Sequence, residues 1–262
     1  MAYIFLPPTL EEILVSHGLS VVAVPDWERR GRPHTVGSFS PSGVLIHHTA
    51  GPAKGNLPSL DTLVDGRPDL PGPLAQLGIA RDGTVYLLAA GRANHAGKAK
   101  ASGPMPAGDG NSLYVGIECE NTGRGEPWPD AQVDAMVRTS AALCRLMRVG
   151  ADHVRGHKET SLEGKIDPAG IDMSDFRQRV AKVLATPSAP IAPKGGLDVD
   201  ENTLRKIIRD ETLGAKFREF TDQDGNGKRD VRSVSEILYA THSAVVDLAR
   251  RMARIEEEIT RR

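Results

Sequence analysis

The chain has only two cysteines among its 262 residues, Cys119 and Cys144, and they form no C-x-x-C spacing. A disulfide framework needs several cysteines at regular spacings, so this class of scaffold is excluded. If the protein binds a metal ion, histidine and carboxylate side chains must supply most of the ligands.

A strong net charge and a long hydrophobic run are also missing. The formal net charge is -1, which gives no electrostatic footprint for nucleic acid or for an anionic membrane. No apolar stretch reaches the roughly 18 residues of a membrane span, so we expect no insertion into a membrane. The segment MAYIFLPPTLEE lacks a basic region and a long apolar core. We therefore expect no signal peptide, and synthesis as a cytosolic polypeptide.

What the chain does contain is a regular alternation of strand and helix patterns. Apolar residues make up 39% and charged residues 26% of the sequence, as in an ordinary soluble globular protein. Interleaved strands and helices predict an α+β (mixed α/β) fold with a central mixed sheet flanked by helices. The Gly/Pro-rich segments 25–42 and 50–74 are predicted to be long loops. We expect strands at 19–24, 43–48, 77–80, 84–89 and 113–118, and helices at 9–18, 129–148 and 172–184, the first opened by a Thr9–Glu12 capping box.

The composition changes near residue 186. The stretch TPSAPIAPKGG, residues 186–196, has no hydrophobic periodicity and predicts a linker. We therefore expect a folded domain over 1–185, a Pro/Gly-rich linker over 186–199 and a helical segment over 200–262.

The last part of this helical segment has a heptad pattern. From Val231 onward an apolar residue recurs every three or four positions, with charged residues between. This pattern is typical of a coiled coil, so we expect a homo-oligomer through this helix. A helix packed on its own domain is the alternative. The repeat positions are Val231, Val234, Leu238, Thr241, Val245, Leu248, Met252, Ile255 and Ile259.

A short acidic stretch, DQDGNGKRD from Asp222 to Asp230, is similar to the opening of a calcium-binding EF-hand loop. The twelfth loop position is Ser233, where such a loop requires a bidentate glutamate. A plain Asp/Gly turn is therefore the favoured interpretation, and calcium binding is the alternative.

Two histidines stand at the end of a predicted buried strand, in GVLIHHTAGP, residues 43–52. Downstream, RGHKETSLEGKIDPAG brings His157, Lys165 and Asp167 within a span of ten residues. A catalytic zinc site takes three protein ligands and leaves a fourth position open. His47, His157 and Asp167 would form such a set of two imidazoles and one carboxylate. A hydrogen-bonded core histidine is the alternative for His47.

Five motifs in order, IHHTAG, RDGTVY, NHAG, VGIECENTG and GHKE…GKIDP, make the chain resemble the type 2 N-acetylmuramoyl-L-alanine amidases, relatives of the peptidoglycan-recognition proteins. The resemblance spans roughly residues 40–185. It implies Zn²⁺ as the cofactor, bound by His47, His157 and Asp167. One departure is Ala75, because many members of the family have a tyrosine at that position.

The resemblance also implies roles for three further residues. Glu118 would act as the general base and Lys165 would stabilise the oxyanion, while His95 would line the substrate groove. General-base and oxyanion roles suit a carboxylate and a compact cation beside a metal. Glu120, two residues after Glu118, is a rival base, and the role of His48 stays open.

The resemblance implies a peptidoglycan substrate and cleavage of the amide between N-acetylmuramic acid and L-alanine of the stem peptide. The arrangement of parts is similar to that of a phage endolysin, which stays in the host bacterial cytoplasm until a holin gives it access to the wall. The segment 200–262 would then bind the cell wall or oligomerise. The alternatives are a non-catalytic peptidoglycan receptor, an endogenous muropeptide-recycling amidase and a virion protein with lytic activity.

Overall fold

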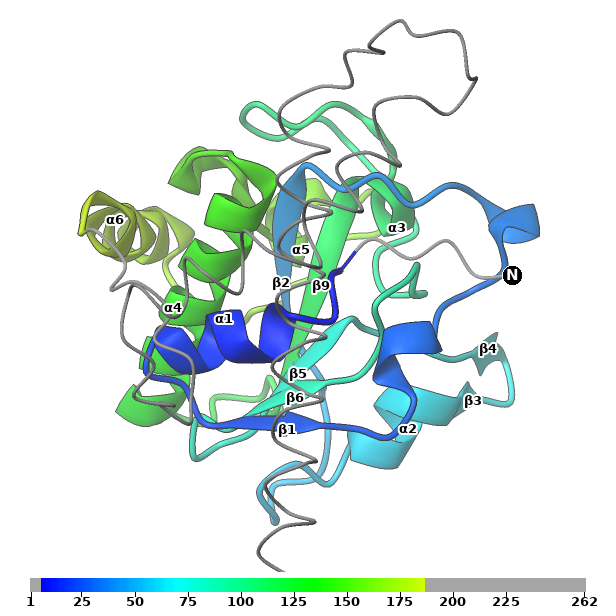
Figure 1. Cartoon of the computed structure of the whole chain (residues 1–262), viewed down its shortest axis with the longest axis horizontal. Coiled ribbons are helices and arrows are strands. Elements are labelled where there is room, and N and C mark those ends of the chain that lie inside the picture. The colour runs from blue at the N-terminus through cyan, green and yellow to red at the C-terminus, as the bar shows by residue number, and fades with distance from the viewer. Residues whose placement is uncertain (1–5, 187–262) are drawn as a thin grey trace, which may run out of the picture. The chain divides into compact units, whose positions relative to one another are not determined.

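The computed structural model describes residues 6–186. A six-stranded mixed sheet forms its centre, with the strand order β1-β6-β5-β9-β2-β10 (Figure 1). Neighbours β5, β9, β2 and β10 run parallel, β6 is antiparallel to β5, and β1 is parallel to β6. The strands are β1 (Val21–Ala23), β2 (Gly43–His48), β5 (Leu77–Ile79), β6 (Val85–Leu87), β9 (Tyr114–Cys119) and β10 (Val154–Gly156).

Three helices, α1 (Leu10–Ser16), α4 (Asp130–Met147) and α6 (Met173–Ala185), lie together beside the sheet (Figure 1). The remaining elements are short and lie in the connections. They are α2 (Leu60–Asp65), α3 (Gly110–Leu113), α5 (His157–Thr160), the 3₁₀ turns Trp27–Arg29, His34–Val36 and Ala151–His153, and the hairpins β3–β4 (Gly66–Arg67, Leu70–Pro71) and β7–β8 (Lys98–Ala99, Gly108–Asp109).

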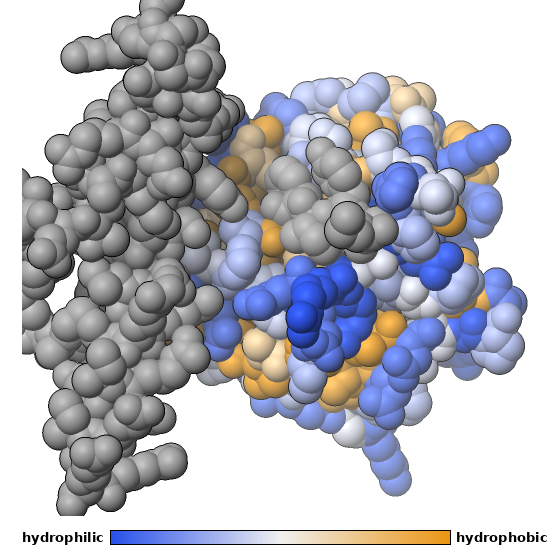
Figure 2. All heavy atoms as spheres, turned by 45° about the vertical axis from the view of Figure 1, so that its right-hand side comes forward, coloured by the Kyte–Doolittle hydropathy of each residue, from blue (hydrophilic) through white to orange (hydrophobic). Residues whose placement is uncertain are grey.

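The position of β2 and β9 in the core explains why their sequences are almost entirely apolar. In β2, Val44, Leu45 and Ile46 are fully buried, as are Val115 and Ile117 in β9. A parallel strand covered on both faces has no polar side to present to water. Each such side chain contributes about 1.5–3 kcal/mol when it is fully buried. The surface in Figure 2 mixes hydrophilic side chains with smaller hydrophobic patches.

The predicted fold class, a mixed sheet flanked by helices, is confirmed. The capping box is wrong, because the Thr9 side chain makes no capping hydrogen bond in α1. The prediction that 50–74 is only a loop is also wrong, because this segment contains α2 and the β3–β4 hairpin. Both elements are very short, so they give almost no periodic signal.

No helix among residues 6–186 is long and apolar enough to cross a membrane. The predicted linker after Thr186, the helical segment 200–262, its heptad repeat and the Asp222–Asp230 stretch lie outside the described residues.

Candidate active site

The sheet register brings three site residues to one edge. In the β2–β9 pairing His47 is the direct partner of Glu118, and in the β10–β2 pairing Gly156 is the partner of Ile46. His157, the residue after Gly156, therefore emerges beside His47. These strands are parallel, so their carboxyl ends meet at one edge, where open α/β sheets bind ligands.

The three predicted metal ligands lie in direct contact. His47 Nδ1 is 3.1 Å from His157 Nδ1 and 2.9 Å from Asp167 Oδ2, and His157 Nδ1 is 3.0 Å from Asp167 Oδ2. All three side chains are buried, and together they form a group able to hold a metal ion. Tetrahedral zinc with bonds of about 2.1 Å separates its ligand atoms by about 3.4 Å, so these donors fit that ion with a small outward shift.

The loop with Asp167 is fixed from several sides. The Lys158 amide donates to the Asp167 carbonyl at 2.7 Å, and Lys158 Nζ donates to the carbonyls of Pro168 and Ile171 at 3.0 and 2.6 Å. His48 Nδ1 accepts a hydrogen bond from the Ala169 amide at 3.1 Å. His48 therefore supports the loop that holds the third ligand.

His95 lies against the back of His47. The His47 Nε2 and His95 Nδ1 atoms are 3.1 Å apart. A hydrogen bond at Nε2 leaves the Nδ1 lone pair of His47 directed at the other two ligands, as is usual for metal-bound histidines. A side chain at Gly116 would clash with the His95 ring. His95 also lines the cleft, so it is placed to orient His47 as well as to contact substrate.

Burial sets the electrostatics of these groups. It lowers the pKa of His47 to about 4, so this imidazole is neutral near pH 7 and its lone pair is free for a metal. Burial also raises the pKa of Glu118 well above its ordinary value, and repulsion from Asp167 and Glu120 adds to the effect. For Asp167, burial alone would raise the pKa, but hydrogen bonds from His157 and His47 outweigh it and hold the pKa low.

Glu118 has the free oxygen that a general base requires. Its Oε1 lies 4.0 Å from His47 Nδ1, a separation that one water molecule can bridge. Its Oε2 is buried and has no hydrogen-bond partner among residues 6–186. The Glu118 carboxylate thus lies beside the three donor atoms of His47, His157 and Asp167, and its Oε2 remains free to accept a proton.

Lys165 lines the same cleft but makes no ion pair with Asp167 among the contacts of residues 6–186. Its side chain is about half exposed and lies 3.8 Å from Glu163. The cleft has a volume of about 540 Å³, and the cations on its lining are Arg67, Arg124 and Lys165. Their charges make this cleft suited to a substrate with carboxylate groups.

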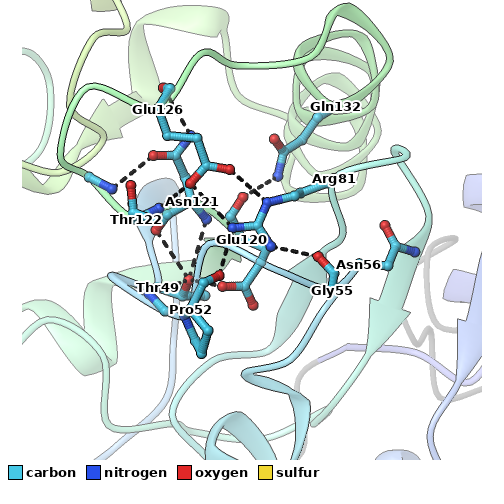
Figure 3. A network of polar contacts seen from close by, with 12 residues as sticks. Thr49, Pro52, Gly55, Asn56, Arg81, Glu120, Asn121, Thr122, Glu126 and Gln132 are labelled. Atoms are coloured by element: carbon cyan, nitrogen blue, oxygen red, sulfur yellow. Dashed lines mark hydrogen bonds and ion pairs between the residues drawn. The ribbon is translucent and has the colours of Figure 1, made fainter.

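The rival base, Glu120, is fully used as a structural group. Its oxygens accept hydrogen bonds from Thr49 Oγ1 at 2.7 Å, and from the Ser59 amide and hydroxyl, both at 3.1 Å. It therefore ties the start of α2 to the loop after β2 (Figure 3). Sequence reasoning missed this role because the contacts span 61 and 71 residues.

An ion pair holds the loops next to Glu120. Arg81 Nε donates to Glu126 Oε1 at 2.7 Å, and the same guanidinium donates to the carbonyls of Gly55 and Pro52 (Figure 3). Glu126 also accepts from the Thr122 amide at 2.7 Å. The hydrogen bond from Arg81 lowers the pKa of Glu126 to about 2. The arginine of the RDGTVY motif thus joins the loops on two sides of the cleft.

Two buried imidazoles and one carboxylate form a group that could hold a metal ion, and a glutamate with one unpaired oxygen lies beside them in the lining of the cleft. Residues 37–170 match the family model described as N-acetylmuramoyl-L-alanine amidase. The chain belongs to this family and is an N-acetylmuramoyl-L-alanine amidase, an enzyme that acts on peptidoglycan.

Solved structures with a similar fold include an AmpD derivative, with 26% identity, coverage of 62% of this chain and 93% of that one, and a TM-score of 0.46. The endolysin LysCS from Clostridium intestinale URNW has 18% identity, covers 62% and 95%, and gives 0.43. Drosophila PGRP-LB has 18% identity, covers 60% and 92%, and gives 0.42. A search of curated proteins found no match.

Proposed function

We propose that this amidase is zinc-dependent and that a bacteriophage uses it to lyse its host. The observation that supports zinc most directly is the triangle of His47 Nδ1, His157 Nδ1 and Asp167 Oδ2, with sides of 2.9 to 3.1 Å. When bound, zinc supplies the Lewis acidity that amide hydrolysis needs, because it lowers the pKa of water to about 7 and polarises a carbonyl.

Glu118 is the residue that moves protons in this proposal. Its unpaired Oε2 accepts a proton from the attacking water, whose hydroxide adds to the lactyl carbonyl carbon. When the C–N bond breaks, the same carboxyl group returns the proton to the nitrogen of L-alanine. A pKa raised by burial suits both halves of this cycle, because the group then titrates nearer to the working pH.

Lys165 is the residue that stabilises negative charge on the carbonyl oxygen. It lines the cleft two positions before Asp167, and its side chain is half exposed and free to reach over a bound substrate. A donor of this kind typically lowers the barrier by about 2.7–4 kcal/mol. The neutral imidazole of His95 keeps His47 in the orientation that this chemistry requires.

The biological part of the proposal rests on the order of parts along the sequence. An amidase domain is followed by a predicted Pro/Gly-rich linker and a predicted helical segment with a heptad repeat. We propose that the enzyme accumulates in the host bacterial cytoplasm and reaches the wall through a holin lesion. The segment 200–262 then increases wall affinity, either by binding a wall polymer or by self-association.

The test combines metal analysis with a wall assay. Wild-type protein should contain one zinc ion per chain, lower the turbidity of purified walls and release new N-terminal alanine without new reducing sugar. Asp167→Ala should lose the metal and the activity together, and a chelator should do the same to the wild type. Wall binding without any alanine release would instead favour a receptor. Activity confined to soluble muropeptides would favour a recycling amidase.

A further inference from the structure

A second cleft, of about 620 Å³, opens next to the catalytic one. Its walls are the loop before α4 and the loop before α6, together with the first turns of α6. The site described above uses almost none of its lining. The lining side chains that are open to a ligand are Trp128, Asp172, Asp175 and Arg179.

The two clefts are separated by a thin partition. Gly123 lines both of them, and a side chain at this glycine would clash with the ring of His48. On its other side His48 accepts a hydrogen bond from the amide of Ala169, which lines the second cleft. The His48 imidazole and the Gly123 loop therefore lie between the catalytic cleft and its neighbour.

The second cleft differs from the first in chemistry. Its lining combines the partly exposed ring of Trp128 with carboxylates and a single arginine, while Phe176 beneath it is buried in the core. Trp128 is held by a hydrogen bond from its Nε1 to the Ala169 carbonyl at 2.7 Å. Arg179 and Asp175 make no ion pair with another residue in the range 6–186. Their polar groups are therefore available to a ligand.

We propose that this second cleft binds the sugar chain of peptidoglycan next to the muramic acid residue whose amide is cut. The inference rests on the proposed function, because it assumes that a wall polymer occupies the catalytic cleft. An aromatic surface packs on the apolar face of a sugar ring, while a carboxylate and a guanidinium hydrogen-bond its hydroxyl and acetamido groups.

Charge distinguishes the two parts of the substrate. The catalytic cleft has three cations, Arg67, Arg124 and Lys165, against the carboxylates of Glu118 and Asp167, and this excess of positive charge attracts the carboxylates of a stem peptide. In the second cleft Glu126 is paired with Arg81, which leaves Asp172 and Asp175 against the single guanidinium of Arg179. A carboxylate-rich peptide is repelled there, whereas an uncharged sugar chain is not. The polymer would thus cross the His48 partition at the scissile bond.

The test compares two substrates on the full chain. Arg179→Ala combined with Asp175→Asn should raise the KM for purified walls about tenfold, equivalent to about 1.4 kcal/mol. Hydrolysis of a soluble muropeptide with one disaccharide should change less than twofold. Lys182→Ala controls for the cation that Arg179→Ala removes, because Lys182 is exposed on α6 and does not line the cleft. Equal changes on both substrates, or no change on either, would overturn the inference.

Direct binding separates this inference from the proposed function. A β-1,4-linked N-acetylglucosamine hexamer, which is neutral and has no peptide, should bind the zinc-loaded wild type in calorimetry, and the Arg179/Asp175 double variant about tenfold more weakly. If the wild type hydrolyses neither substrate, the proposed function is wrong. The titration then still shows whether the second cleft binds a sugar chain. Absence of hexamer binding to a folded wild type would contradict the cleft assignment.

Discussion

Two parts of the molecule contain glutamates with little solvent exposure, and the carboxylates have different numbers of hydrogen-bond partners in the two parts. At the sheet edge, Glu118 keeps one oxygen without a partner among residues 6–186, as do His95 and His157 with one ring nitrogen each. In the loop network, Glu120 accepts three hydrogen bonds, and Glu126 accepts from Arg81 and Thr122. An unsatisfied buried polar group is costly, so its retention indicates a chemical use. A carboxylate whose oxygens all have hydrogen-bond partners indicates a structural role.

The largest expected effect is loss of the donor triangle. His157→Ala removes one of three ligands, so zinc should be lost and wall hydrolysis should fall to the level of walls without enzyme. Metal content and alanine release, measured on the same preparation, check this. Hydrolysis by a metal-free His157→Ala protein that is folded would show that the triangle is not the catalytic centre.

Glu118→Gln should reduce turnover about 10²–10⁴-fold, because proton transfer is lost while the shape is kept. Zinc content should be unchanged, and the free energy of unfolding should stay the same or rise, since a buried carboxylate without a full set of partners is removed. Rate assays and denaturant unfolding on one preparation measure both effects. A lower free energy of unfolding with normal turnover would instead give Glu118 a structural role, like that of Glu120.

Lys165→Ala should lower kcat about 10²–10³-fold through loss of charge stabilisation on the carbonyl oxygen. Zinc content should not change, because the ion pair of Lys165 is with Glu163 and not with a ligand. Glu163→Gln, which removes the charge next to Lys165, is the matched control and should stay within a fewfold of wild type. Unchanged kcat in Lys165→Ala would assign the oxyanion role elsewhere.

Glu120→Gln should act on stability instead. The carboxamide keeps one acceptor oxygen and puts an NH2 donor in place of the other, so at least one of the hydrogen bonds from Thr49 and Ser59 is lost and the free energy of unfolding should fall by about 1–3 kcal/mol. The kcat of the folded fraction should remain within a fewfold of wild type. Urea unfolding monitored by circular dichroism, together with active-fraction assays, distinguishes this from Glu118→Gln.

The smallest effect concerns pH and the Arg81–Glu126 pair. The folded pKa of Glu126 is about 2, below its ordinary value. The stabilising contribution is therefore present above about pH 4.5 and is lost as the pH falls towards 2. The pair is close to the surface, so its contribution is at most about 1 kcal/mol. The difference in unfolding midpoint between wild type and Glu126→Gln should shrink over this range, and a constant difference would contradict the assignment.

The sequence predicted the elements that have a strong local signal. The strand 43–48 appears with the bounds Gly43–His48, and the ligand motifs at His47, His157 and Asp167 converge as expected. Contacts between segments that are far apart in the sequence could not be predicted from it. The sequence alone leaves Glu120 as a rival base, because the Ser59 amide that occupies it lies 61 residues away along the chain. The contact of His95 with His47 likewise depends on a glycine in a third segment, Gly116.

The position of two ligands at the ends of paired strands has a further consequence. His47 belongs to β2 and His157 directly follows β10, and these strands are hydrogen-bonded to each other. Their separation is set by the backbone ladder, so the two imidazoles should stay together when a loop frays. Release of a bound ion should therefore require either the opening of the sheet or the departure of the Asp167 loop, which Lys158 and His48 hold in place. Ion retention during heating would then serve as a readout that both the sheet and this loop are intact.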